Sequence, residues 1–284
     1  MIIPGKSLAA PGGSLHGFMK SLAKGISRNA ASVDSRKQAR QAVHRIRTSA
    51  KRLRALLQLA TPTLPKRKRR AARSAIRRVK AAVASARDAD VMADLLKSIS
   101  ATAGEGDLAT ATRRPSRTRL MRLASDLEVR ISALSVANLR LSEGLIRVCD
   151  TYSRARLEGA ACGVQPLDDA MHNWRKRVKT LYYQAEAFSE LTPLKTVSKR
   201  AKALAKLLGD HHDLAVLEGQ LAKGKGVRPR LLPQIAARKA TLTAQSLKAG
   251  TILFRMDPGG FAKLLQPPLR AALTKTAGKS TGRS

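Results

Sequence analysis

Two stretches of the sequence carry histidine, arginine and lysine at the same helical spacing. In the first, 43–60, the residues His44, Arg47, Lys51 and Arg54 stand three or four positions apart. At about 100° per residue, these four side chains fall within an arc of about 80° on one helix face. Cationic side chains in such a row bind polyanions, because guanidinium groups make paired, charge-assisted hydrogen bonds to phosphoryl or carboxylate oxygens.

The second stretch, 171–188, matches 43–60 position by position at an offset of 128 residues. Its residues on the same row are His172, Arg175 and Lys179, with Tyr182 in the place of Arg54. A further pair of segments, 87–96 and 212–221, matches at an offset of 125. Two matches in the same order at nearly the same offset indicate an internal repeat, and therefore one domain built from two similar halves.

The charge around the first row has no acidic partner nearby in the sequence. The chain of 284 residues has 55 Lys or Arg and 19 Asp or Glu, a formal net charge of +36. Between Arg36 and Arg87 there are eighteen basic residues and no acidic one. Soluble helices usually intersperse Glu with Lys, since like charges four residues apart are destabilising. The expected partner is therefore a polyanion: nucleic acid, an anionic membrane or a phosphate polymer.

The elements that position these rows are predicted to be helices throughout. Apolar residues recur three and four positions apart almost everywhere, and Ala, Leu, Arg and Lys dominate the composition. The predicted helices are 15–31, 35–60, 66–99 with a break near Arg87, 116–139, 141–158, 168–190, 194–222 and 229–254. Gly209 is expected to mark a matching break in the second half. The tail 256–284 is expected to be mostly disordered, with one short helix at 259–273.

Each row stands beside an apolar stripe that can anchor its helix in a bundle. In the first copy the stripe is Val43, Ile46, Ala50, Leu53 and Leu57. In the second copy it is Met171, Trp174, Val178, Leu181, Ala185 and Phe188. Each helix thus packs by one face and presents cations from the neighbouring face. Two such helices, in halves related by a pseudo-twofold axis, would bring their rows together across a shared groove.

The histidines and aspartates of the repeat allow more than one role. His44 and His172 either contact a bound phosphate in protonated form or form structural hydrogen bonds. Asp88 and Asp213 are interpreted as orienting or capping residues. Neighbouring helical residues point about 100° apart, so 211–213 makes a poor metal site without further carboxylates. With no phosphate-binding glycine loop and no metal or nucleophile motif in the sequence, no cofactor and no catalytic residue are expected.

Composition also bears on the cellular compartment. Cys149 and Cys162 are too few for a disulfide scaffold and are expected to be reduced thiols. The first residues lack a basic region followed by a long apolar run, so no secretory signal is expected. No run of about 18 apolar residues predicts a membrane span. The expected location is the cytoplasm.

The motif H-x-x-R-x-x-x-K-x-L at 44–53 and 172–181, followed by segments 87–88 and 208–213, resembles the CHAD domain family. The resemblance covers roughly 15–255, with halves of about 15–158 and 168–255. It implies an all-α fold of two four-helix bundles related by a pseudo-twofold axis, with a basic central cleft. It also implies non-enzymatic binding of inorganic polyphosphate and association with polyphosphate granules.

Carried over residue by residue, the resemblance assigns polyphosphate-binding positions in both halves. One side of the cleft would be His44, Arg47, Lys51 and Arg54, and the other His172, Arg175 and Lys179. Further candidates are Arg87, Lys202 and Lys206. Tyr182 departs from the family's basic residue, although its hydroxyl can donate. Thr180 stands in the place of Arg52 and is expected to be a lost charge on the second side.

Two other functions compete with this one. A pI of about 11.6 and the run KRKRR at 66–70 fit a nucleic-acid or general polyanion binder. Against that function, only eight residues are aromatic, whereas single-strand binders stack bases on aromatic side chains. A metal-dependent phosphohydrolase would need clustered carboxylates. The run at 66–70 and the tail lysines exceed what one groove needs, which suggests attachment to a granule or nucleoid surface. The oligomeric state is left open.

Overall fold

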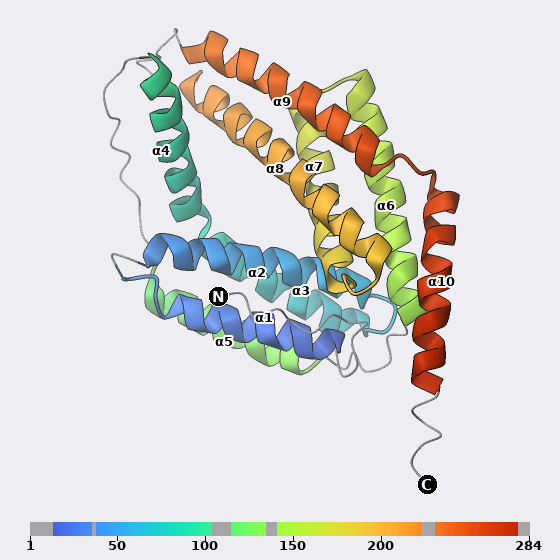
Figure 1. Cartoon of the computed structure of the whole chain (residues 1–284). Helices are drawn as coiled ribbons and strands as arrows, with labels where there is room; N and C mark the ends of the chain where they lie inside the picture. The colour runs from blue at the N-terminus through green and yellow to red at the C-terminus, as the bar shows by residue number, and fades with distance from the viewer. Residues whose placement is uncertain (1–13, 36–37, 104–114, 135–140, 223–230, 278–284) are drawn as a thin grey trace.

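The computed structural model describes residues 14–35, 38–103, 115–134, 141–222 and 231–277. In this part of the chain every regular element is an α-helix and none is a strand, which confirms the predicted all-α class. The helices are α1 (Leu15–Ala30), α2 (Ala39–Leu59), α3 (Lys66–Ala82), α4 (Ala84–Ala103), α5 (Arg117–Ser132), α6 (Leu141–Val164), α7 (Asp168–Ala187), α8 (Thr192–Leu221), α9 (Leu231–Leu253) and α10 (Pro258–Ala277) (Figure 1).

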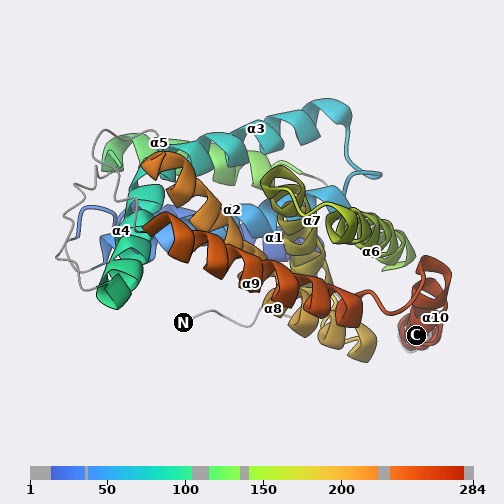
Figure 2. The same cartoon turned by 90° about the horizontal axis from the view of Figure 1, so that it is seen from above.

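The helices pack as two sets of four. Helices α1, α2, α3 and α5 contact one another in the first set, and α6 to α9 do so in the second. Helix α4 contacts α2 and α3 of the first set and α8 and α9 of the second, while α10 packs against α6. Figure 2 shows α4 and α10 at opposite ends of the molecule. By packing, α6 belongs with the second set, whereas the division expected from the sequence placed it in the first half.

The two repeated segments form α2 and α7, and their apolar stripes lie in the core. Every residue of both predicted stripes is no more than 3% exposed. The main apolar core runs continuously through both sets of helices. A smaller one joins α4, α8 and α9. Direct packing of α2 against α7 unites the two sets and places the two cationic rows close together.

The helix predicted at 66–99 divides into α3 and α4 at Val83, four residues before the break expected near Arg87. The break predicted at Gly209 is wrong, because α8 runs unbroken from Thr192 to Leu221. The break predicted after residue 158 is also misplaced, since α6 continues to Val164. At the offset of 125 residues, the single helix α8 corresponds to α3 and α4 together. The repeat therefore differs at this point, where the first half bends and the second does not.

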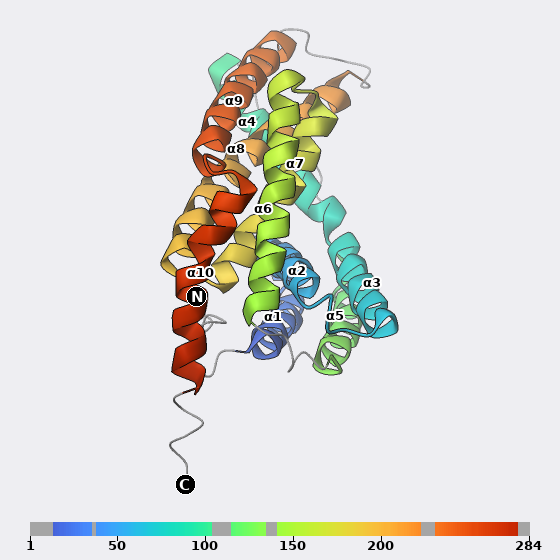
Figure 3. The ribbon, with the colours of Figure 1, turned by 90° about the vertical axis from the view of Figure 1, so that its right-hand side faces the viewer.

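The tail is also more ordered than its composition suggests. Helix α10 spans Pro258–Ala277 and lies alongside α6 (Figure 3). The Phe261 ring is 1% exposed and stacks on the Tyr152 ring of α6 with centroids 3.9 Å apart. Asp257 accepts backbone hydrogen bonds from Gly259 and Gly260, which caps the helix start. The short helix predicted at 259–273 is confirmed and is five residues longer, so the expectation of a mostly disordered tail is wrong for this part; residues 278–284 lie outside the described part.

Trp174 on α7 is the largest side chain in the core, and two glycines make room for it. A Cβ atom at Gly250 of α9 would lie 2.7 Å from the indole Cη2, and one at Gly159 of α6 would lie 2.8 Å from Cζ2. Gly250→Ala is therefore expected to destabilise the protein by about 1–3 kcal/mol, since the indole is held on all sides. Thermal or urea unfolding measures this difference.

Gly25, inside α1, is the matched control because nothing lies within 4 Å of a Cβ atom built there. Gly25→Ala is expected to stabilise the protein by up to about 1 kcal/mol through helix propensity alone. Equal effects of the two substitutions would show that the close approach at Trp174 does not limit the packing.

Candidate functional site

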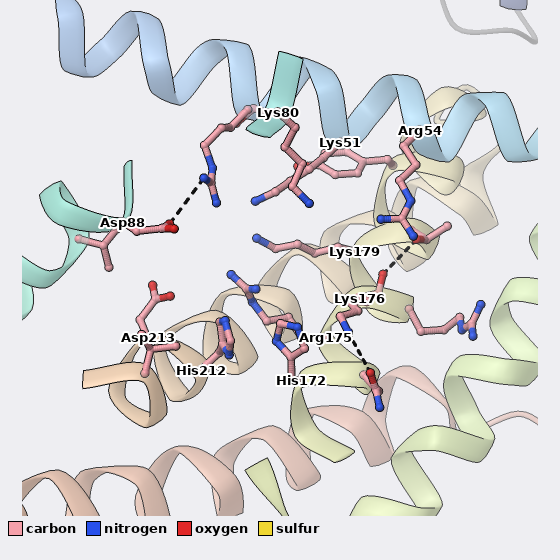
Figure 4. A pocket seen from close by; sticks show the side chains of 18 of the residues that line it. Lys51, Arg54, Lys80, Asp88, His172, Arg175, Lys176, Lys179, His212 and Asp213 are labelled. Atoms are coloured by element: carbon pink, nitrogen blue, oxygen red, sulfur yellow. Dashed lines mark hydrogen bonds and ion pairs between the residues drawn. The ribbon is translucent and has the colours of Figure 1, made fainter. Parts of the chain in front are cut away.

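A pocket of about 930 Å³ lies between α2 and α7, with further walls from α3, α4, α6 and α8. This α2–α7 pocket contains most of the cations singled out by the sequence. Its basic lining residues are Arg47, Lys51, Arg54, Lys80, Arg175, Lys176, Arg177 and Lys179. Its histidines are His44, His172 and His212, and its acidic residues are Asp88, Glu158 and Asp213. Figure 4 shows the cations of α2 and α3 facing those of α7 across the space.

Seven of the residues predicted from the sequence line this pocket: His44, Arg47, Lys51, Arg54, His172, Arg175 and Lys179. Both members of each repeated pair are present, so α2 and α7 contribute equivalent side chains to opposite walls. The spacing of three and four residues accounts for this result, because the buried stripe of each helix fixes which neighbouring face meets the pocket.

Tyr182, Lys202 and Lys206 do not line the pocket. The Tyr182 hydroxyl donates to Glu186 Oε1 at 3.0 Å, within the packed contact between α2 and α7. Lys202 and Lys206 lie on the exposed face of α8, and Lys206 Nζ is 2.9 Å from Asp210 Oδ2, one turn along the same helix. The side chain of Arg87 lies outside the described part of the chain.

Among the Lys, Arg and His residues of the lining, four were not predicted: Lys80, Lys176, Arg177 and His212. Lys80 comes from the end of α3, and no pattern within its own helix indicates the pocket. His212 was considered only as a metal ligand, yet its ring lies beside that of His172, with centroids 4.1 Å apart. Its position opposite Arg87 in the repeat was the available signal, because Arg87 was itself a candidate.

Acidic residues hold two of the lining arginines in place. Arg47 Nη1 lies 3.5 Å from Asp88 Oδ1 and donates to the Ala84 carbonyl oxygen at 3.5 Å. This geometry fits the orienting role expected for Asp88. Arg177 lies on the α6 side and contacts Glu158 Oε1 at 2.9 Å.

Gly209 supports Arg175 instead of ending a helix. It is buried within α8, and a Cβ atom built there would lie 3.7 Å from the Arg175 Nε atom. The Arg175 side chain therefore rests against the bare backbone of α8. A glycine read from the sequence as a helix break is here part of the wall behind a cation.

The two walls are joined away from the pocket by hydrogen bonds between α2 and α7. Arg52 donates to Glu186 Oε1 at 2.9 Å, and Gln184 Nε2 donates to the Ala55 carbonyl oxygen at 3.3 Å. Arg52 is not a lining residue. Thr180, at the equivalent position of α7, does line the pocket, so the two positions differ in role: Arg52 joins α2 to α7.

Lys51 is partly buried among cations from α2, α3 and α7. Its pKa is lowered to about 6, first by burial and then by the charges of Lys179, Arg175, Arg47 and Lys80. The pKa of Lys80 is also lowered, by burial and then most by Arg54. Charges from α2, α3 and α7 thus act on the same small volume. In the unliganded protein Lys51 is mostly neutral at pH 7.

The pKa values of His172 and His212 are lowered for the same reasons, which favours their neutral forms. Burial, then Arg175 and His172, lower the pKa of His212 to about 4. Burial, followed by Lys176 and Arg175, lowers the pKa of His172. The His172 Nδ1 atom is buried and has no hydrogen-bond partner among the described residues. An anion that enters the pocket would favour protonation of these rings, and each ring could then donate hydrogen bonds.

The described residues contain neither a metal site nor a membrane-spanning helix. No group of three or more His, Cys, Asp or Glu there is placed to hold a metal ion. Among the described helices, none is both long and apolar enough to cross a bilayer.

Neither the curated proteins nor the solved structures contain a match to the chain. A family profile, that of the CHAD domain, matches residues 20–222. This region runs from α1 to the end of α8 and includes both cationic rows and every residue that lines the α2–α7 pocket. It is well over half of the chain, and it confirms the resemblance drawn from the repeated motif: the chain belongs to the CHAD domain family.

Proposed function

We propose that this chain binds inorganic polyphosphate in the α2–α7 pocket and performs no reaction on it. The observation that carries the proposal is that both repeated rows line one pocket, where Lys51 of the first row lies close to Arg175 and Lys179 of the second. The family is generally linked to polyphosphate binding, which agrees with the chemistry of the lining residues.

The electrostatics of the pocket favour a ligand with closely spaced negative charges. Eight lining residues are Lys or Arg and three are Asp or Glu. Two of those carboxylates already contact arginines within the pocket. The Lys51 pKa is lowered first by burial and then by four neighbouring cations, which adds to the repulsion within the pocket. Each phosphate that enters would relieve this repulsion, release condensed counterions and accept hydrogen bonds from arginine forks.

The same observations support the finer architecture implied by the resemblance. We infer that the two sets of four helices are two bundles related by a pseudo-twofold axis, with the α2–α7 pocket as their basic central cleft. Equivalent residues on opposite walls support this inference. We also propose that the protein acts in the cytoplasm at polyphosphate granules, and fluorescence microscopy of a tagged chain in granule-forming cells tests that location.

Nucleic acid is the second candidate because the whole chain is strongly basic. Tyr183 is the one aromatic residue in the pocket lining, apart from histidines, and it is 7% exposed. Phosphate contacts carry no base information, and a single-strand site usually adds aromatic stacking. The pocket lining therefore favours a polyanion without bases.

A competition titration tests the proposal. Labelled polyphosphate is bound to the intact protein at about 150 mM salt, where exposed charges are screened over about 8 Å. Unlabelled polyphosphate is expected to displace it at concentrations at least about tenfold lower, per phosphate, than RNA or duplex DNA, because only buried contacts resist screening. Equal displacement by all three polymers would overturn the proposal. Incubation with Mg²⁺ or Mn²⁺ is expected to release no orthophosphate, and steady release would identify an enzyme.

A further inference from the structure

Eight of the nine cations of α3, all except Arg67, fall into two groups by what they contact. On the side facing α5, Arg78 pairs with Asp126, and Lys68 Nζ donates to the Ala133 carbonyl oxygen at 3.3 Å. Arg69 donates to the Thr61 carbonyl oxygen at 3.3 Å, beside the end of α2. These three side chains have roles within the fold.

A second group has no such role. Lys66, Arg70, Arg73 and Arg77 are exposed, and none makes a hydrogen bond or ion pair with a described residue. With Lys80 they fall within an arc of about 80° on the helix surface. We call these five residues the α3 row. It extends over fourteen residue steps, or about 21 Å. Helix α3 itself contains no acidic residue.

The α3 row begins inside the pocket. Lys80 is a lining residue, and it faces Arg54 of α2, which also lines the pocket (Figure 4). Arg54 is the nearby charge that acts most strongly on Lys80. Helix α3 runs along the edge of the molecule beside α2 in Figure 2. A row that starts at Lys80 therefore leads outward from the pocket along this edge.

The second half also carries exposed lysines on one face of α8, at Lys195, Lys199 and Lys202, but none of these three lines the pocket. At the offset of 125 residues, Ala205 takes the place of Lys80, and Ala205 is 4% exposed. Lys206 is directed away from the pocket and pairs with Asp210. The cationic row of α3 therefore begins at a residue that lines the pocket, whereas the lysine row on the described part of α8 does not.

We propose that the α3 row is a second binding segment, which holds the part of a long polyphosphate chain that extends from the pocket past Lys80. This inference rests on the proposed function. It assigns a role to Lys66 and Arg70 of the run at 66–70, which the pocket leaves unexplained. Binding along the row would be intramolecular once the pocket is filled, so affinity would rise with chain length until the row is covered.

The test compares two triple variants that lose the same charge. Arg70→Ala/Arg73→Ala/Arg77→Ala removes the middle of the α3 row. The control, Arg28→Ala/Arg154→Ala/Arg238→Ala, removes three exposed arginines of α1, α6 and α9 that do not line the pocket. Dissociation constants are measured for polyphosphates of defined length, from chains that fill only the pocket to long ones, over a series of salt concentrations.

The row variant is expected to bind the shortest chains within twofold of the wild type and the longest about tenfold more weakly. On long chains its slope of log Kd against log salt is expected to fall by about 2, the value for three lost phosphate contacts. The control is expected to keep the wild-type dependence on chain length. Equal losses in both variants, or an unchanged length dependence in the row variant, would overturn the α3 row.

The outcome for the proposed function can be read separately. If the wild type binds short polyphosphate no better than RNA, the pocket assignment fails whatever the row does. If short chains bind tightly and only the length dependence disagrees, the row assignment alone fails. A row variant that loses RNA binding while keeping its polyphosphate length dependence would assign the row to nucleic acid and overturn this inference.

Discussion

Replacing Arg47 and Arg175 together with alanine is expected to weaken polyphosphate binding by a factor on the order of 10³. The two arginines are equivalent in the repeat and line opposite walls of the pocket. Each forms hydrogen bonds with charged oxygens in the proposed complex, and such bonds contribute about 1.5–3 kcal/mol apiece. Fluorescence titration of the double variant against the wild type, at fixed salt and pH, measures the loss.

Either single substitution is expected to reduce the binding free energy by less than half of the loss in the double variant. Arg47 and Arg175 both lower the pKa of Lys51, so removing one lets Lys51 recover part of its charge. Arg47→Lys with Arg175→Lys is the informative control, because it keeps both charges and loses the planar fork. Circular dichroism checks that every variant is folded. A well-folded double alanine variant with wild-type affinity would show that the ligand lies elsewhere.

Polyphosphate binding is expected to weaken as pH rises through the neutral range, and the dissociation constant is expected to increase by a factor of several tens between pH 6.5 and 8.5. In the unliganded protein the pKa of Lys51 is about 6, so its amine is mostly neutral in this range. A bound phosphate favours the ammonium form and raises this pKa. Binding therefore takes up a proton between the two pKa values, and affinity falls by up to tenfold per pH unit above pH 6.

Other groups facing Lys51 set the limits of this effect. Lys80 faces it from α3, and Lys179 and Arg175 face it from α7. Lys80 adds a smaller proton uptake at more alkaline pH because its pKa is lowered less. His212, with a pKa of about 4, and His172 add uptake toward acid pH. Long chains make the measurement clean, since their internal phosphates do not titrate here.

Calorimetry in buffers of different ionisation enthalpy counts the protons directly. Lys51→Met is expected to lose most of the uptake at pH 7.5 and to flatten the pH profile. The same variant is expected to be more stable without ligand at pH 7, by on the order of 3 kcal/mol. The sign follows from the lowered pKa: between about pH 6 and pH 10.5 the unfolded chain holds a proton on Lys51 that the folded chain has released. Lys24→Met, at an exposed site on α1, is expected to change neither quantity. An unaltered proton count in Lys51→Met would exclude Lys51 as its source.

The features that could be predicted from the sequence are those that one helix encodes by itself. The buried stripe of α2 fixes its orientation, and the repeat transfers that orientation to α7. The seven correct lining residues follow from these two facts. Lys80 could not be found in this way, because its position depends on how α3 crosses α2. Tyr182 was misplaced for a similar reason, since packing against α2 directs its hydroxyl to Glu186.

The break predicted at Gly209 and the disorder predicted for most of the tail were both inferred from composition, which carries no information on tertiary contacts. Gly209 has the lowest helix propensity short of proline, yet α8 continues through it because neighbouring residues on both sides are buried. The tail has few apolar residues, but Phe261 and Leu265 are spaced to pack one helix face, and both are buried. Tertiary contacts outweigh local propensity in each case.

The bond between Arg52 and Glu186 joins residues 134 positions apart and lies behind the two cationic walls. Most other helix contacts of α2 and α7 fall within their own sets. We expect each set to gain its structure first, so that late in folding two like-charged partners have to approach. A polyanion present at that moment would act as a shared counterion and speed their docking. In this respect the ligand would serve as a template for the protein's own assembly.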